Sequence, residues 1–146
     1  MKRVAFVLVA LLALVAGVLS AGEFSHPSVI ELSSKNFDAS VSDGNVWFIK
    51  FYAPWCGHCK RLAPTWGELA DATKSIPDVG SKIRVAHLDC TKNREVCTTY
   101  EIRGYPTLKV FHGGEGQEAY RQARSFDALK KYITGKAKDL LTETTA

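Results

Sequence analysis

Residues 46–60 have the sequence VWFIKFYAPWCGHCK, and the rest of the chain is organised around this segment. The part from Val46 to Tyr52 is apolar at nearly every position, which predicts a central strand covered on both faces. Ala53-Pro54 ends that strand, and from Cys56 onward apolar residues recur at helical spacing. Two cysteines, Cys56 and Cys59, are therefore expected where a strand leads into a helix.

The Cys56 and Cys59 thiols are predicted to form a redox pair. Their spacing is close to one helical turn, so at the start of a helix both sulfurs lie on one face. Unpaired N–H groups and the helix dipole favour a thiolate there, and a charged His58, next to Gly57 between the thiols, adds to this effect. Cys56 is the expected nucleophile, and Cys59 is the expected resolving thiol.

Two alternatives for this pair remain open. A C-x-x-C pair is half of a four-ligand zinc site, but the other cysteines, Cys90 and Cys97, have an unusual spacing for zinc, and the histidines show no H-x3-5-H pattern. The second alternative is a permanent structural disulfide. The small ring closed by a disulfide at a helix start is strained and accessible, which suits thiol-disulfide exchange better than a permanent structural role.

Residues 1–22 are predicted to be a secretory signal peptide. Met1-Lys2-Arg3 precedes an unbroken apolar or glycine run over residues 4–19, and small residues suited to cleavage after Ser20 or Gly22 follow. The run is short for a membrane span, which needs about 20 residues, so an uncleaved anchor is the less favoured alternative. After cleavage, no membrane association is expected.

The remaining chain is expected to be one catalytic domain, residues 23–141, with a polar tail at 142–146. With 19 basic and 15 acidic residues and no basic stripe, nucleic acid is not an expected partner. Four cysteines in a secretory chain indicate an oxidising compartment. The endoplasmic reticulum lumen is the first expectation, and secretion stays open because the end of the chain carries no Lys-Asp-Glu-Leu type retention signal.

The pattern of apolar runs and turn residues predicts an α/β fold, a mixed central sheet with helices on both faces. The predicted elements are a short strand at 29–32, a helix capped by Ser33 or Ser34 up to Val41, a strand at 46–52, a helix at 56–73 kinked by Pro64, a strand at 83–88, a helix from 92 or 93 to 100, a strand at 107–111, a turn at Gly113-Gly114, a strand near 118–121 and a final helix capped by Ser125.

Two segments, FYAPWCGHCK at 51–60 and RGYPT at 103–107, carry a family resemblance. Over residues 24–140 the chain is similar to a single catalytic thioredoxin-fold domain of the protein disulfide isomerase family. The resemblance implies a thiol-disulfide oxidoreductase and isomerase that forms and rearranges disulfides in proteins folding in the secretory pathway. It implies no metal, nucleotide or prosthetic group.

By the same resemblance, Pro106 is expected to be cis and to lie against the thiols, with the Tyr105 backbone free to pair with an extended substrate. Trp55, Tyr105 and Pro106 would then form an apolar rim that binds unfolded chains. The alternative for Trp55 is an ordinary core position.

Two charged residues, His58 and Arg103, are expected to adjust the redox potential of the thiol pair and the pKa of Cys59. A charged His58 stabilises the reduced pair, which makes the disulfide a better oxidant. The resemblance implies that Arg103 swings toward Cys59 and lowers its pKa; the alternative is a solvated loop charge. Lys60 and Arg61 are expected only to keep the helix face soluble.

Lys50 is the main departure from the family, whose members usually have a buried glutamate at this position. His87 occupies the position where relatives often carry a lysine. We hypothesise that Lys50 and His87 together replace the carboxylate as proton acceptor for Cys59. A partly exposed Lys50 without a chemical role is the alternative.

Cys90 and Cys97 match positions where several family members have a structural disulfide, and two free buried thiols are the alternative. The expected partners are unfolded or misfolded secretory proteins with thiols or disulfides, and glutathione or a thiol oxidase. Two rival functions remain: a chaperone-like binder of unfolded chains whose thiols are incidental, and a thioredoxin-like disulfide reductase.

Overall fold

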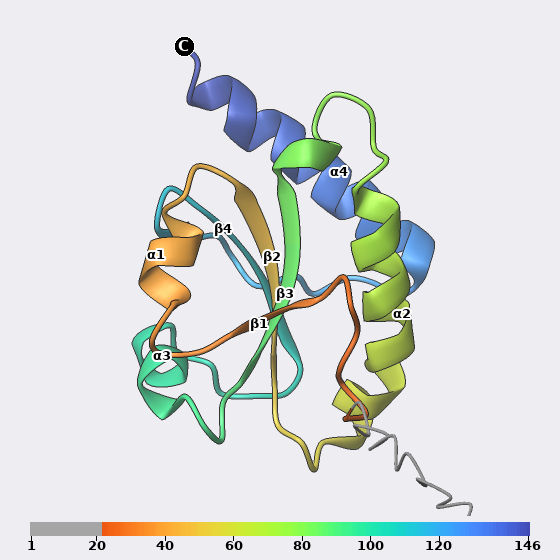
Figure 1. Ribbon diagram of the computed structural model, residues 1–146, viewed down its shortest axis with the longest axis vertical. Coiled ribbons are helices and arrows are strands. Elements are labelled where there is room, and N and C mark those ends of the chain that lie inside the picture. Colours follow the sequence, from red (N-terminus) through yellow and green to blue (C-terminus); the bar gives the residue numbers. More distant parts are fainter. Residues whose placement is uncertain (1–21) are drawn as a thin grey trace, which may run out of the picture.

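The computed structural model describes residues 22–146, so the predicted signal peptide, apart from Gly22, lies outside the described residues. Strands and helices follow one another in the predicted order (Figure 1). The elements are β1 Ile30–Leu32, α1 Phe37–Val41, β2 Val46–Tyr52, α2 Gly57–Thr73, the 3-10 helix η1 Gly80–Lys82, β3 Ile83–Asp89, α3 Arg94–Thr99, β4 Thr107–His112, β5 Glu115–Gly116 and α4 Phe126–Glu143.

A five-stranded mixed sheet forms the centre of the molecule, as predicted. The strand order is β1-β3-β2-β4-β5, with β1 and β2 parallel to β3 and β4 antiparallel to both β2 and β5. β2 and β3 each have a neighbouring strand on both edges. Their register places Lys50 of β2 directly beside His87 of β3.

Helices cover both faces of the sheet: α2 and α4 on one, α1 and α3 on the other (Figure 1). All seven residues of β2 are buried, which fits its nearly unbroken apolar sequence. Successive side chains of a strand point to opposite faces, so Phe48 packs under α2 and α4 whereas Ile49 and Phe51 pack toward α1 and α3. Lys50 lies on the same face as Phe48 and therefore points toward α2.

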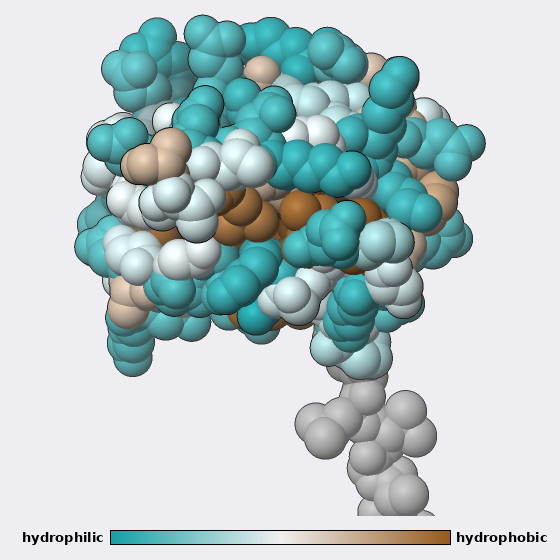
Figure 2. Space-filling view, turned by 90° about the horizontal axis from the view of Figure 1, so that it is seen from above, coloured by the Kyte–Doolittle hydropathy of each residue, from teal (hydrophilic) through white to brown (hydrophobic). Residues whose placement is uncertain are grey.

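The surface seen from above is mostly hydrophilic, with a narrow hydrophobic band in its middle (Figure 2). Within residues 22–146, no helix has the length and apolar character that crossing a membrane requires.

The prediction for the last strand was wrong. β5 comprises only Glu115–Gly116, although the chain keeps two further backbone hydrogen bonds to β4, from Gln117 N–H to the Val110 carbonyl (2.7 Å) and from Tyr120 N–H to the Leu108 carbonyl (2.8 Å). Residues 118 and 119 therefore stand together opposite Lys109. This extra residue is a β-bulge, which interrupts the ladder and bends the segment.

One turn prediction was confirmed and one cap prediction was wrong. Gly113 and Gly114 have φ values of 60° and 81°, which suits a two-residue hairpin turn between β4 and β5. Helix α1 begins after Asn36 instead of after the predicted serines. The reason is a tertiary contact: the Ser34 N–H and hydroxyl both donate to Asn93 Oδ1, at 2.8 and 3.1 Å.

The final helix α4 has the predicted cap, because the Ser125 hydroxyl accepts a hydrogen bond from Ala128 N–H at 3.3 Å. The helix continues through Glu143. Residues 142 and 143, predicted to belong to the polar tail, are thus part of α4.

Candidate active site

The two central thiols lie at the N-terminus of α2. Cys56 is the N-cap residue, and its Sγ accepts a hydrogen bond from Cys59 N–H at 3.3 Å. Both cysteines are free thiols; Cys56 is 6% exposed and Cys59 is completely buried. An N-cap sulfur faces the positive end of the helix dipole, which favours a negative charge on Cys56 Sγ. The geometry therefore fits the predicted order of attack, in which Cys56 reacts first.

A loop far along the chain packs against Cys56. The Tyr105–Pro106 peptide bond is cis, and Cys56 Sγ lies 3.5 Å from the Tyr105 carbonyl oxygen. Trp55 is 71% exposed, and its ring meets the Tyr105 ring edge-on with a centroid distance of 5.8 Å. Trp55 is thus a rim residue and not part of the core. The structure brings Trp55, Tyr105 and Pro106 together beside the reactive thiol.

His58 is exposed, and its partner is a residue that sequence reasoning had set aside. Arg61 Nη2 lies 2.8 Å from His58 Nδ1. Arginine has only donors, so Nδ1 is the acceptor and the imidazole is neutral in this arrangement. The cation beside the thiols is then the Arg61 guanidinium, which also lies 4.0 Å from the place where a Cβ on Gly57 would stand. The i, i+3 spacing of His58 and Arg61 on α2 was the sequence signal for this contact.

Cys59 is held protonated by its surroundings. Burial, followed by the hydrogen bond with Cys56, raises the pKa of Cys59 to about 12, and the charge of Lys50 partly opposes this rise. A thiol with such a pKa does not ionise by itself near pH 7. The attack of Cys59 on a mixed disulfide therefore requires a nearby proton acceptor or a cation that stabilises the thiolate.

Lys50 is buried, with 1% of its surface exposed. Three aromatic rings surround its ammonium group, with Nζ at 5.3 Å from the centroid of Phe24, 5.6 Å from Tyr52 and 6.0 Å from Trp66. Burial lowers the pKa of Lys50 to about 8, against the opposing attraction of Cys59. The alternative of a partly exposed Lys50 is therefore wrong. The amine is neutral in an appreciable fraction of molecules near pH 7, which an exposed lysine is not.

His87 lies beside Lys50 in the sheet and is 4% exposed. Within residues 22–146, its Nδ1 is buried without a hydrogen-bond partner. Burial, followed by the charge of Lys50, lowers the pKa of His87 to about 4, while Asp89 opposes this change. The ring is consequently neutral at pH 7, and it contacts the Tyr52 ring in a tilted arrangement with a centroid distance of 5.1 Å.

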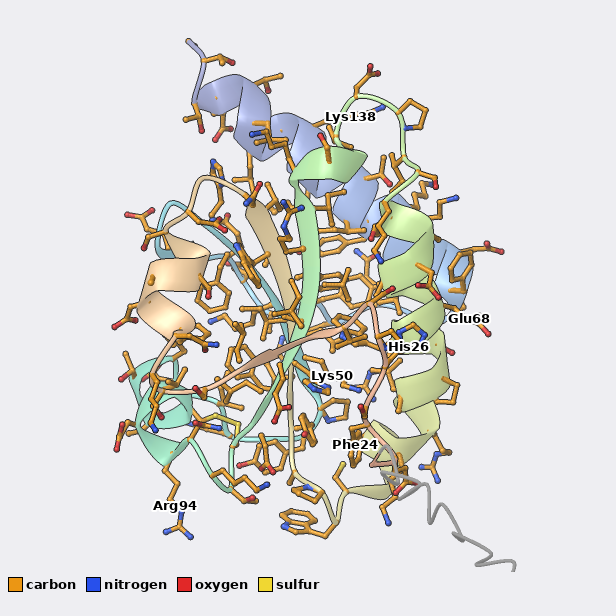
Figure 3. The ribbon with its side chains drawn as sticks, viewed as in Figure 1. Phe24, His26, Lys50, Glu68, Arg94 and Lys138 are labelled. Atoms are coloured by element: carbon orange, nitrogen blue, oxygen red, sulfur yellow. A yellow bond between two sulfur atoms is a disulfide. The ribbon has the colours of Figure 1, made fainter. Side chains whose placement is uncertain are left out.

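The segment before β1 covers this buried cluster, and nothing in its sequence indicated that role. The Phe24 ring packs against the Tyr52 ring, with a centroid distance of 4.5 Å, and covers the Lys50 side chain (Figure 3). His26 fixes the segment to α2, because a Cβ on Gly67 would stand only 2.5 Å from the imidazole Cδ2. Short segments without hydrophobic periodicity carry no pattern from which such a contact can be predicted.

Arg103 does not lie at the thiols in this structure. Its side chain is 85% exposed, and its guanidinium forms an ion pair with Glu101 at 3.8 Å. The expected approach to Cys59 would require this exposed pair to break. The arrangement corresponds to the alternative of a solvated loop charge.

The second cysteine pair is oxidised. Cys90, directly after β3, is joined to Cys97 in α3 by a disulfide with a Cα–Cα distance of 5.8 Å. The structure therefore has the staple that the family resemblance implied, in place of two free thiols. In the described part of the chain, no group of three or more His, Cys, Asp or Glu side chains is arranged to hold a metal ion.

The cysteine pair lies at the start of a helix and faces a cis-proline loop, where the inner strand β2 ends and the inner strand β4 begins. This arrangement defines a thioredoxin-type site. The family whose sequence profile matches is described as thioredoxin and covers residues 28–135. The chain belongs to this family. Among its relatives, protein disulfide-isomerase 1 of Dictyostelium discoideum is 42% identical over 94% of this chain, and human protein disulfide-isomerase A6 is 39% identical over 82%.

Within the thioredoxin family, the relationship is to the protein disulfide isomerases. The solved first thioredoxin domain of mouse protein disulfide-isomerase A4 superimposes with a TM-score of 0.65 and 32% identity, covering 78% of this chain and 76% of that domain. The chain spans only 36% of the length of the Dictyostelium protein and 26% of the human one. It is similar to one thioredoxin domain of each.

Proposed function

We propose that this chain is a thiol-disulfide oxidoreductase and isomerase that forms and rearranges disulfides in proteins folding in the secretory pathway. The observation that carries the proposal is the position of Cys56 Sγ, at the N-cap of α2 and 3.5 Å from the Tyr105 carbonyl beside a second free thiol. A reactive thiol, a resolving thiol and a backbone edge for an extended chain meet there. Relatives named protein disulfide isomerase support this assignment.

The exchange proceeds by two thiolate attacks. In the reductive direction, Cys56 thiolate attacks one sulfur of a substrate disulfide, a Cys56–substrate bond forms, and the other substrate sulfur leaves as a thiolate. Cys59 thiolate then attacks Cys56 Sγ, which forms the Cys56–Cys59 bond and releases the second substrate thiolate. Oxidation of a substrate dithiol is the same sequence reversed. Isomerisation uses the first attack, after which a different substrate thiolate attacks the mixed disulfide, forms a new substrate disulfide and releases Cys56 as a thiolate.

Lys50 and His87 take the place of an acidic proton acceptor in this proposal. The neutral Lys50 amine accepts the Cys59 proton, and the resulting ammonium stabilises the thiolate in a site that contains little water, where charges interact strongly. His87 keeps the neighbouring position uncharged near pH 7, because its lowered pKa leaves the ring neutral beside the Lys50 ammonium. Arg61, held by the neutral His58 ring, adds positive charge on the solvent side of the thiols.

The substrates we propose are unfolded or misfolded secretory proteins that carry thiols or disulfides. The exposed Trp55 and the adjacent Tyr105 ring supply an apolar surface for such chains. The proposed compartment is the lumen of the endoplasmic reticulum. Glutathione or a thiol oxidase is the proposed source of oxidising equivalents.

Reactivation of scrambled ribonuclease A in a glutathione buffer tests the function. The wild-type domain is expected to restore ribonuclease activity, and the Cys56→Ala/Cys59→Ala double variant is expected not to. Suppression of ribonuclease aggregation, measured by light scattering with the same two proteins, separates catalysis from simple binding. Equal reactivation by the two proteins would contradict the proposal and favour a chaperone-like binder.

The pH profile tests the proton acceptor. Insulin reduction by Lys50→Ala and His87→Ala is measured from pH 6 to pH 9 beside the wild-type domain. A profile shifted toward alkaline pH is expected for Lys50→Ala, because Cys59 loses the group that opposes its raised pKa. If neither variant alters the rate or the profile, both residues are bystanders.

A further inference from the structure

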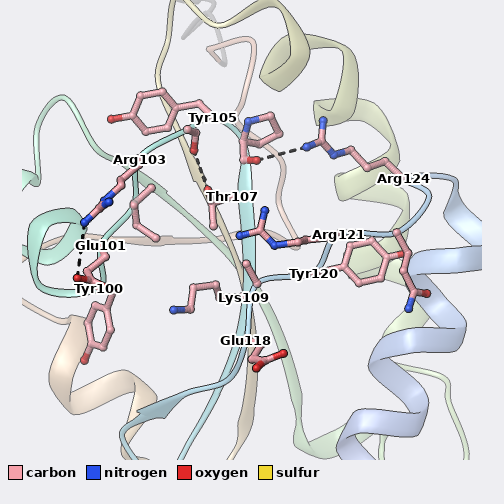
Figure 4. Close-up of a pocket in the computed structure, with 15 residues that line it drawn as sticks. Tyr100, Glu101, Arg103, Tyr105, Thr107, Lys109, Glu118, Tyr120, Arg121 and Arg124 are labelled. Atoms are coloured by element: carbon pink, nitrogen blue, oxygen red, sulfur yellow. Dashed lines mark hydrogen bonds and ion pairs between the residues drawn. The ribbon is translucent and has the colours of Figure 1, made fainter.

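A groove of about 1190 Å³ opens beside the thiols, between the loop that follows α3 and residues 118–124 (Figure 4). One end of the groove is formed by Tyr105 and Pro106. The Tyr105 carbonyl lies 3.5 Å from Cys56 Sγ, so this end of the groove lies next to the reactive thiol. A chain bound at Cys56 can therefore extend into the groove.

A β-bulge lies in the segment after β5, beside the groove. Residues 118 and 119 stand opposite Lys109, so the regular ladder with β4 is interrupted between the hydrogen bonds of Gln117 and Tyr120. Thr107 and Lys109, which line the groove, are only half-buried although they belong to a strand of the central sheet. The groove floor is a stretch of β4 that no helix and no further regular strand of residues 22–146 covers.

The groove is predominantly basic. Its charged lining residues are four cations and two carboxylates, namely Arg103, Lys109, Arg121, Arg124, Glu101 and Glu118. Arg103 is paired with Glu101 at 3.8 Å, and Arg124 donates to the Pro106 carbonyl at 3.5 Å.

Two of these cations have no such partner. Among residues 22–146, no hydrogen bond or ion pair is made by the side-chain nitrogens of Lys109 or Arg121, and both side chains project into the groove (Figure 4). Glu118 lies at the far end of the groove and forms no ion pair with either of them. An anionic ligand would therefore meet two available donors without displacing an existing pair.

We propose that this groove binds an acidic segment of the substrate polypeptide next to the cysteine that reacts at Cys56. The inference rests on the proposed function and adds a substrate preference to it. The groove is open and elongated, its floor is a strand with exposed side chains, and its free charges are positive. These properties fit an extended peptide that carries Asp or Glu, and they disfavour a basic one.

The geometry sets where the acidic residue must lie. A strand advances roughly 3.3 Å per residue, so the four steps from Tyr105 to Lys109 cover about 13 Å. A substrate chain in the groove therefore places side chains two to four positions from its cysteine near Lys109 and Arg121. Acidic residues further away are expected to have little effect, because solvent and salt screen such charges.

The test uses the oxidised domain and short synthetic dithiol peptides. Each peptide loses two electrons and two protons as its own disulfide forms, and the Cys56–Cys59 disulfide is reduced to two thiols. Trp55, next to the thiols, reports the change through its fluorescence in a stopped-flow experiment. The peptides differ only in three residues on one side of the first cysteine, which are acidic, neutral or basic.

We expect the acidic peptide to be oxidised about threefold to tenfold faster than the neutral one at low salt, and the basic peptide to be slower. The preference should fall toward unity at ~0.5 M salt. Lys109→Gln/Arg121→Gln should abolish it, and Arg121→Glu should reverse it. Lys138→Gln removes the same charge from an exposed position on α4, far from the thiols, and should leave the preference intact.

Each remaining outcome overturns the inference. Equal rates for acidic and neutral peptides would show that the groove does not select charge. A preference that survives in Lys109→Gln/Arg121→Gln, or that is lost equally in Lys138→Gln, would assign the effect to the net charge of the domain. These results are distinguishable from failure of the proposed function, in which case no peptide is oxidised, including the neutral one.

Discussion

Two pairs of cysteines follow the ends of two neighbouring parallel strands, and they are in opposite redox states. Cys56 follows β2 and is a free thiol with Cys59, whereas Cys90 follows β3 and is bonded to Cys97. The two sites are in direct contact, since Cys90 N–H donates to the Tyr52 carbonyl at 2.9 Å. Position at the end of a strand therefore does not distinguish a reactive pair from a structural one.

The difference lies in what surrounds the sulfurs. The reactive pair begins at the N-cap of a 17-residue helix and has the cis-proline loop, a buried lysine and a buried histidine nearby. The Cys90–Cys97 bond lies in the apolar layer under α1 and α3, within a cluster that includes Phe37 and Phe111. A helix dipole and nearby proton acceptors make a thiol reactive because they favour the thiolate. Apolar surroundings do not favour the thiolate, so a disulfide there is not readily exchanged.

Cys56→Ala is expected to give the largest effect that separates the two pairs. Disulfide exchange should fall by roughly 10³-fold or more, because the variant lacks the attacking sulfur. Cys59→Ala should instead accumulate a mixed disulfide with substrate, since the resolving thiol is missing. Both are measured by ribonuclease reactivation, with non-reducing gels to detect the trapped complex. Retention of most activity in Cys56→Ala would assign catalysis to another thiol.

Lys50→Met tests whether the buried Lys50 ammonium lowers the free energy of unfolding of the domain. A lysine whose pKa falls to about 8 in the folded state disfavours folding at pH values below 8, where it must be buried as an ammonium ion. The penalty shrinks as the pH rises from 8 toward the ordinary lysine value. Lys50→Met should therefore raise the free energy of unfolding by about 3 kcal/mol at pH 7 and by about 1 kcal/mol at pH 10.

Urea unfolding at the two pH values measures this change. Lys138→Met, at an exposed position on α4, serves as the control and should alter stability little at either pH. A destabilised Lys50→Met protein at pH 7 would show that the aromatic rings around Nζ compensate for the buried charge.

Cys90→Ala/Cys97→Ala is the counterpart at the structural pair. Removal of a disulfide that closes so short a loop should lower the free energy of unfolding by about 2.5 kcal/mol on the chain-entropy model. Ribonuclease reactivation at a temperature where the variant stays folded should remain within about twofold of wild type. A large loss of activity in the folded variant would mean that the second pair takes part in exchange.

His87→Leu is expected to give the smallest of these effects. The pKa of His87 is lowered from 6.5 to about 4, so the unfolded chain binds a proton between these pH values that the folded chain does not. Stability is consequently lost as the pH falls through this window. His87→Leu should remove about 2 kcal/mol of the stability difference between pH 7 and pH 5. Parallel pH curves for variant and wild type would show that His87 does not titrate as described.

Local sequence was sufficient for the central strand, the long helices and the redox pair. The apolar run of β2, the helical spacing of Leu62 and Trp66 on α2, and the Ser125 cap of α4 each depend on neighbouring residues alone. The bulge after β5 was missed because its cause is the pairing with β4, which local propensity does not encode.

By itself, the sequence was sufficient to predict the redox pair, because the spacing of the two thiols and their place before a helix are properties of consecutive residues. Only the tertiary structure decided which titratable groups are buried near them. Burial of Lys50 depends on Phe24 from the beginning of the domain, on Trp66 from α2, and on the register that sets His87 beside it. Desolvation is a property of the assembled surroundings, so no run of residues reveals that Lys50 is buried or that Arg103 is exposed.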